Sequence, residues 1–425
     1  MKVKVRTRSW VTLEKVLLSF AILAISSFAL LEHMSIPIPA FSAIKWPLLY
    51  VGGACVLTQF NLMIKSFMKR KYFFVWISLL LLIVVLFFAA FQNRNPVLGV
   101  SPMRNTARMV LYLVELMMLI VWVCEKNYCQ YFIKYLFRYV LLLVVITDVV
   151  LFTGMIRFHI GHHEMYLIGS KFTVSYMHMN LLALWVLQTD EIVHLKQFSR
   201  LKLCLVAVFL VAVSLRVECM TGMIGCLLLF ICLFVVGSPT AKKRLHKLAS
   251  PAILNISLGA NFLFPFLSEV VVSLPFINYF VVRVLDRSEN LTGRTNIFNI
   301  FSDQMAGHWL FGYGMGNQNV AAMTLFGYAN AQNAILQWIL QGGIVVTFAM
   351  ALYMNHVFIR IGKSGNVRKA MPMVVLIYVY IILGFVETTF SMSFLLWIAV
   401  LLVLIYQKPV EQDVPKAPTE FSAAH

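Results

Sequence analysis

Long apolar stretches, separated by short polar or basic segments, repeat along nearly the whole chain. A helix needs roughly 20 mostly apolar residues to cross a hydrocarbon layer about 30 Å thick, and it satisfies its own backbone hydrogen bonds there. The pattern predicts an all-α polytopic membrane protein with about 12 transmembrane helices. We place these spans at about residues 11–31, 46–64, 72–91, 106–124, 131–153, 174–189, 201–216, 220–236, 250–270, 333–358, 371–387 and 390–407.

Composition agrees with a membrane protein. Apolar residues make up 61% of the chain and charged residues 12%, whereas soluble domains carry roughly 25% charged residues. We expect residues 1–407 to form a single membrane domain. The tail, residues 408–425, is rich in Pro, Glu and Ala, and this composition predicts disorder.

The basic residues predict how the chain is oriented. An even number of spans places both termini on one side, and 25 of the 35 Lys and Arg fall in the termini and in the loops on that side. Short cytoplasmic loops hold an excess of Lys and Arg, so both termini are predicted to be cytoplasmic and the large loop at about 268–332, between spans 9 and 10, external. The same bias accounts for the net charge of +18, which therefore does not indicate nucleic-acid binding.

The cations predicted to lie outside differ in type from those inside. Outside there are 8 Arg and 2 Lys, against 8 Arg and 17 Lys inside. The planar fork of Arg grips phosphate at two points, so the external face is suited to phosphate. In the large loop, Arg283 and Arg287 flank an apolar helical stripe that would lie on the membrane surface. Arg294 falls in the first turn of a second amphipathic helix, whose apolar side is Ile297, Phe298, Ile300 and Phe301.

Several polar residues lie at or near the outer ends of spans. Arg216 and Glu218 form one short external tip and Glu387 lies in another, where both would face the space under the large loop. His178 and Asn180 at the outer start of span 6 are candidates for a pocket wall, and a helix cap is the alternative. Glu115 lies deeper, where a structural pairing is the alternative to a functional role.

Two other motifs favour ordinary structural roles. His159, His162, His163 and Glu164 could bind zinc, but their spacing matches no helical metal motif, so we predict a solvated loop and no metal site. Gly312, Gly314 and Gly316 follow no strand, which favours a tight turn over a nucleotide-binding loop.

A family resemblance rests on motifs in the large loop and the helix after it. These are TGRT at residues 292–295, GHWLFGYG at 307–314, NAQN at 330–333 and LQWILQGG at 336–343. The chain resembles the O-antigen ligase and polysaccharide polymerase family over about 75 residues by motif and over its whole length by topology. The resemblance implies a GT-C-like architecture and an inverting, metal-independent glycosyltransferase that needs no cofactor and uses undecaprenyl-pyrophosphate sugars.

The resemblance also implies roles for particular residues. Arg294 matches the arginine of the family's G-R element, and Arg216 approximately matches a second family arginine, both on the pyrophosphate. Gln332 stands where the family usually has the histidine of a His-Asn pair, and Asn333 matches the asparagine. Gln cannot titrate, so it can orient a sugar hydroxyl but cannot act as a general base. The candidates for a base are Glu218, Glu387, Asp303 and His308.

These observations predict a polysaccharide polymerase that joins lipid-linked oligosaccharide repeat units on the outer face of the cytoplasmic membrane, for a capsule, an exopolysaccharide or an O-antigen. The lipid-linked oligosaccharide would be both donor and acceptor. The chain-length regulator and the flippase of the same pathway are candidate partners. The alternatives are a ligase that transfers the finished glycan and a flippase for the same lipid-linked sugar; a transporter more often shows symmetric halves and charges at the membrane midplane.

Overall fold

The computed structural model describes residues 2–35, 37–95, 100–154, 158–160, 163–189, 197–236, 247–279, 282–283 and 293–407. Most of these residues are helical, and the strands among them, β1 (Phe158–Ile160) and β2 (His163–Met165), form a short antiparallel hairpin. Six of the described helices are long and apolar enough to cross a membrane, so the chain is an all-α membrane protein. They are α1 (Lys2–Leu30), α4 (Arg70–Gln92), α5 (Pro102–Glu125), α6 (Cys129–Thr153), α11 (Pro251–Ser273) and α15 (Ala334–Lys363).

The other predicted spans coincide with helices that are bent, shorter or less apolar. α2 (Phe41–Leu57) and α3 (Phe60–Phe67) are bent by 71° at a break, and together they could form a seventh span. The remaining helices at predicted spans are α7 (Lys171–Gln188), α8 (Gln197–Arg216), α9 (Met220–Val236), α16 (Val367–Leu383) and α17 (Met392–Tyr406). None of these five is among the helices found to meet the criteria for a full span within the described residues, so the count of twelve spans stays a prediction.

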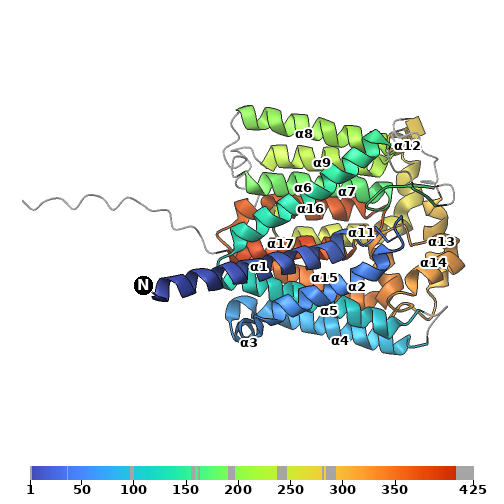
Figure 1. Cartoon of the computed structure of the whole chain (residues 1–425). Coiled ribbons are helices and arrows are strands. Elements are labelled where there is room, and N and C mark those ends of the chain that lie inside the picture. The colour runs from blue at the N-terminus through green and yellow to red at the C-terminus, as the bar shows by residue number, and fades with distance from the viewer. Residues whose placement is uncertain are drawn as a thin grey trace, which may run out of the picture.

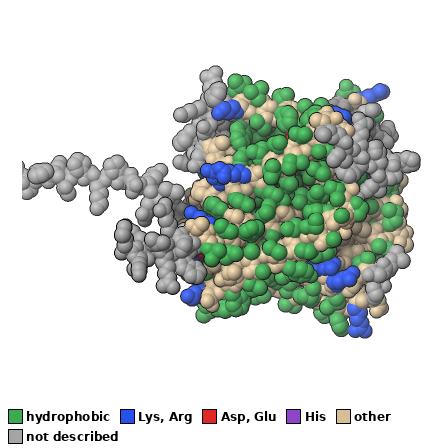
Figure 2. All heavy atoms as spheres, in the orientation of Figure 1, with side chains coloured by type: hydrophobic (Ala, Val, Ile, Leu, Met, Phe, Trp, Pro, Cys, Tyr) green, Lys and Arg blue, Asp and Glu red, His purple; other side chains and the backbone are tan. Residues whose placement is uncertain are grey.

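The bundle has two ends, because its long helices run side by side (Figure 1). α1 begins at the left end of the view, which we call the amino-terminal end. The short helices α12 (Pro275–Tyr279), α13 (Arg294–Gln304) and α14 (Gln318–Phe326) lie at the opposite end, which we call the loop end. Hydrophobic side chains cover the middle of the face seen in Figure 2, and Lys and Arg gather towards both ends, as expected for a protein surrounded by lipid.

The amino-terminal end holds ion pairs that use its excess of basic residues. Glu125, at the end of α5, pairs with Lys69 and lies 2.7 Å from Lys71. Glu14 of α1 lies 3.2 Å from Lys126. All three lysines belong to loops predicted to be cytoplasmic. The side of the membrane that this end faces stays a prediction.

The second predicted amphipathic helix of the large loop is α13. Ile297, Phe298 and Phe301 are buried there, as predicted, and Arg294 is the first residue of the helix. Ile300, the fourth residue of the predicted apolar side, is 39% exposed because it lies at the edge of the buried arc.

The first amphipathic helix is described only in part. α12 covers five residues of it, and Arg283 is exposed. Arg287 lies outside the described residues, as does the tail at 408–425. α11 continues to Ser273, so the loop begins slightly later than residue 268.

The loop is joined to the bundle where α15 is interrupted. Gly343 has a φ of 74° and a ψ of −176°, a conformation that is essentially restricted to glycine. This break leaves backbone N–H and carbonyl groups of α15 without helical partners. The turn at residues 307–314 supplies the missing hydrogen-bond partners. The N–H of Ile344 donates to the carbonyl of Trp309 at 2.8 Å, and the N–H of Tyr313 donates to the carbonyl of Leu340 at 2.9 Å.

The glycine-rich segment forms the tight turn that the sequence predicts. Gly312, Gly314 and Gly316 have φ angles of 58°, 90° and 94°. These positive angles suit glycine, which has no Cβ.

Candidate functional site

The polar turn between α16 and α17 forms the floor of the site. With 17 and 15 residues, these helices are about 25 Å and 22 Å long, short of a hydrocarbon layer of about 30 Å. Because Glu387 of the intervening turn pairs with Arg294 of α13 at the loop end, we infer that the turn at residues 384–391 is recessed at that end. The sequence predicted span 11 to end at residue 387, but the helix ends at Leu383, so Glu387 lies in the turn.

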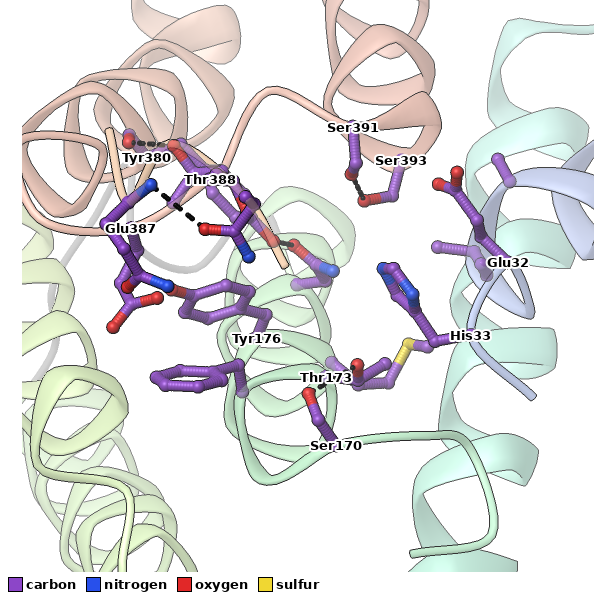
Figure 3. A pocket seen from close by; sticks show the side chains of 18 residues that line it. Glu32, His33, Ser170, Thr173, Tyr176, Tyr380, Glu387, Thr388, Ser391 and Ser393 are labelled. Carbon is purple, nitrogen blue, oxygen red and sulfur yellow. Dashed lines mark hydrogen bonds between the residues drawn. The ribbon is translucent and has the colours of Figure 1, made fainter. Parts of the chain in front are cut away.

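A cavity of about 210 Å³ lies over this turn, and we call it the polar cavity. Its apolar lining residues are Ala29, Leu30, Phe172 and Met177. The others have polar side chains: Glu32, His33, Ser170, Thr173, Tyr176, Asn180, Asn330, Gln332, Tyr380, Glu387, Thr388, Thr389, Ser391 and Ser393. Hydroxyl, amide and carboxyl groups thus surround a space enclosed by apolar helices. Glu32 and His33 lie on one side of it, facing Tyr176 and Glu387 on the other (Figure 3).

Glu387 is held by Arg294. The guanidinium of Arg294 pairs with the Glu387 carboxylate and also donates from Nε to the carbonyl of Val386 at 2.7 Å. Burial raises the pKa of Glu387 above its usual value, and Arg294 opposes this effect. The pair connects α13 to the floor of the polar cavity, so the first turn of the loop helix and the recessed turn are one unit.

Asn180 and Gln332 are the other predicted site residues that line the polar cavity. Tyr380 donates its hydroxyl to Oδ1 of Asn180 at 2.7 Å, which fixes the amide. Gln332 has a φ of 53°, and its backbone N–H donates to Oδ1 of Asn330 at 2.9 Å. Its side chain faces the cavity together with Glu387 and Asn180.

Asn333 is placed for a structural role. It is fully buried, and its Oδ1 caps α15 by accepting from the N–H of Leu336 at 2.9 Å. Its Nδ2 donates to the carbonyls of Asn261 and Phe385. Its amide is therefore occupied, and it does not line the polar cavity.

His178 does not line the polar cavity, contrary to the pocket prediction. Its Nε2 lies 3.1 Å from Asp148 of α6, and its Nδ1 lies 2.8 Å from the carbonyl of Val174. Residues two apart on a helix point to different faces, so Asn180 reaches the cavity while His178 faces α6. The alternative prediction of a helix cap also fails, because the imidazole pairs within the bundle.

The remaining predicted residues lie away from the polar cavity. Arg216 is exposed and lines a separate small hollow with Glu164 and Tyr166. Burial raises the pKa of Tyr166 to about 12, so its hydroxyl stays neutral at physiological pH.

Glu218 is exposed at a φ of 53° in the turn between α8 and α9. His308 stacks on Tyr313, with ring centroids 4.0 Å apart. Neither residue lines a cavity together with Glu387. The structure brings Asn180, Gln332, Glu387 and Arg294 together and leaves the other candidates apart.

A second cavity of about 250 Å³ adjoins the first, and we call it the cationic cavity. Lys45 of α2 and Arg108 of α5 line it, together with the aromatic residues Phe28, Trp46, Trp338 and Phe390. Glu32 and Ser391 line both cavities.

The sequence reasoning missed Glu32 and His33. They directly follow the first predicted span, which ends at about residue 31, and we did not consider them as site residues. A carboxylate and an imidazole at the outer end of a span are polar residues of the same kind as His178 and Asn180, so the same reasoning could have selected them.

Of the histidine-rich segment, His162 lies outside the described residues, so the prediction for that segment is not tested. Within the described residues, no three His, Cys, Asp or Glu side chains are placed to hold a metal ion. A scan against protein-family models and a search of characterised proteins found no match to this chain.

Proposed function

We propose that the chain is an inverting glycosyltransferase, a polysaccharide polymerase that joins undecaprenyl-pyrophosphate-linked repeat units at the loop end of the bundle. The observation that carries the proposal is the polar cavity, recessed among membrane helices and lined by hydroxyl, amide and carboxyl groups. Such groups donate to and accept from sugar hydroxyls. A lipid-linked glycan has its apolar part in the membrane and its sugars at this depth.

In the proposed reaction, a hydroxyl of the acceptor glycan attacks the anomeric carbon of the donor. A new C–O bond forms, and the bond between the anomeric carbon and the pyrophosphate oxygen breaks with its electron pair on the pyrophosphate. The hydroxyl proton passes to a general base. Asn180 and Gln332 would orient the acceptor by hydrogen bonds, since neither side chain can take the proton.

Glu32 is the best placed base. Among the described residues, its Oε2 accepts one long hydrogen bond, 3.4 Å from the N–H of Met392, and the side chain lines both cavities. The Glu387 carboxylate is instead held in an ion pair with Arg294, so it is less available to an acceptor hydroxyl. Glu32 therefore replaces the four candidates drawn from the sequence.

A matched pair of carboxylates tests this role. Glu32→Gln keeps the shape and removes the base, so the rate of polymerisation should fall by about 10² to 10⁴. Glu269→Gln is the control, because Glu269 is exposed at the same end of the bundle and contacts Asn299, outside both cavities. Polymer synthesis by the Glu32 variant at the control rate and at equal abundance would remove Glu32 from the mechanism.

Gene deletion separates the reaction classes. Single repeat units that accumulate on the outer leaflet indicate a polymerase, and full-length chains that remain on the lipid carrier indicate a ligase. Units trapped on the inner leaflet indicate a flippase. Either of the last two results would contradict the proposed function.

One observation favours transport as a second candidate function. Glu115 is buried in α5 against Gly52 and Gly53 of α2, and its carboxyl oxygens have no hydrogen-bond partner among the described residues. Intramembrane carboxylates often serve proton-coupled transport. The polymerase proposal predicts that Glu115→Gln retains polymer synthesis. Loss of synthesis with repeat units trapped on the inner leaflet would favour transport.

A further inference from the structure

The cationic cavity contains two positive side chains that are not neutralised by ion pairs. Among the described residues, neither Lys45 nor Arg108 has a carboxylate within 4.0 Å, whereas Arg294 is paired with Glu387. Both line the cavity and are only partly exposed. Partly buried cations in a cavity are expected to have an anionic partner, because taking a charge out of water is costly unless it is paired.

Aromatic rings hold these cations in position. The guanidinium carbon of Arg108 lies 3.6 Å from the centroid of the Trp46 ring. Nζ of Lys45 lies 5.2 Å from the Phe28 ring and 5.8 Å from the Trp46 ring. Stacking uses the face of the guanidinium and leaves its N–H edge available, and that edge forms two-point hydrogen bonds with phosphate.

The rest of the lining suits a sugar. Four carboxamides face the cavity, from Asn105, Gln318, Asn319 and Gln341, and each can both donate and accept. Trp338 and Phe390 close the apolar side of the cavity; both are buried and pack on each other, with ring centroids 4.7 Å apart. A phosphate group next to a sugar would use both parts of the lining.

We propose that the cationic cavity binds the glycosyl pyrophosphate headgroup of the lipid-linked donor, with Lys45 and Arg108 on the pyrophosphate; this inference rests on the proposed function. Two cations match the two charges of a substituted pyrophosphate, while a phospholipid phosphodiester carries one. Glu32 adds a negative charge to the lining, but it stands at the border with the polar cavity. A donor held here has its anomeric carbon at that border, beside the proposed base.

Binding to the purified full-length chain in nanodiscs tests the site without turnover. The probes are undecaprenyl pyrophosphate and phosphatidylglycerol. Arg108→Gln and Lys45→Gln should each weaken binding of undecaprenyl pyrophosphate by about tenfold or more, the effect of losing a charge-assisted hydrogen bond. Arg104→Gln is the matched control, because Arg104 lies one turn away on α5, is exposed and does not line the cavity; its affinity should stay within about twofold.

The outcomes distinguish the ligand and the function. Unchanged affinity in both cavity variants, each eluting as a folded monodisperse protein, overturns the site. An equal loss for phosphatidylglycerol assigns the cavity to ordinary phospholipid and also overturns the proposal. Arg108→Lys keeps the charge and the fold but loses the fork, so it should bind with intermediate affinity. If deletion shows a flippase while Arg108→Gln still loses the pyrophosphate probe, the proposed function fails and the site remains.

Discussion

Gly343→Ala tests the union between the large loop and the bundle most directly. Gly343 interrupts α15 at a φ of 74° and a ψ of −176°. A Cβ built there would overlap the carbonyl of Leu310 and the N–H of Phe311. Both are backbone groups of the docked turn, so no side-chain rotation can relieve the overlap.

Two costs determine the expected magnitude. Alanine in this region of φ and ψ costs about 1 to 3 kcal/mol. The overlap with the turn costs about 1 to 3 kcal/mol more, as for overpacking in a core. The free energy of unfolding should therefore fall by about 2 to 6 kcal/mol, a large part of the 5 to 15 kcal/mol typical of a folded protein.

The assay is thermal unfolding of the purified chain in detergent, followed by the monodisperse fraction after heating. Gly362→Ala is the control in the same helix, since a Cβ there meets nothing within 4 Å. It should leave the midpoint unchanged or raise it slightly, because alanine favours a helix over glycine by about 0.5 to 1 kcal/mol. Equal midpoints for the two variants would refute the docking of the turn on the break of α15.

Three further predictions concern packing inside the bundle. Gly53→Ala brings a Cβ within 2.6 Å of Oε1 of Glu115 and should lower the free energy of unfolding by about 1 to 3 kcal/mol. Gly259→Ala is the control, because its Cβ meets nothing within 4 Å; a lower thermal midpoint for the Gly259 variant than for the Gly53 variant would contradict the contact with Glu115. Asn333→Ala removes the α15 cap and should cost about 1 to 2 kcal/mol, measured by chemical unfolding, and an unchanged curve would deny the cap. Arg294→Met leaves Glu387 buried with no cation and should cost about 3 kcal/mol or more; adding Glu387→Gln should restore part of the lost stability, and no recovery in the double variant would argue against the pair.

The positions of the helices follow from the sequence, because each span depends on local apolar content. The break between α2 and α3 was missed, since Thr58 and Gln59 are too few polar residues to interrupt an apolar count. α16 was expected at residues 371–387 but lies four residues earlier, at Val367–Leu383, so the turn before α17 is longer than the sequence predicted.

The site was only partly predictable, because its residues come from distant segments. Asn180 and Glu387 were found by their polarity at span ends, and Gln332 by its place in the motif that carries the family resemblance. Asn180 and His178 are two residues apart on a helix and therefore point to different faces. The sequence reasoning did not take this into account. The engagement of Arg294 by Glu387 depends on tertiary packing between α13 and the turn after α16, so neither local pattern could show it.

The docking of the 307–314 turn on α15 limits how this protein can be recombined. The backbone N–H and carbonyl groups of the turn form hydrogen bonds with those of α15 at its break, so each segment needs the other. A chimera that exchanges the large loop alone would separate them, while a crossover after residue 345 would transfer both. Residues 307–345 should therefore be exchanged together, although they include both loop and helix, and a module that extends back to Arg294 would also need the turn at 384–391.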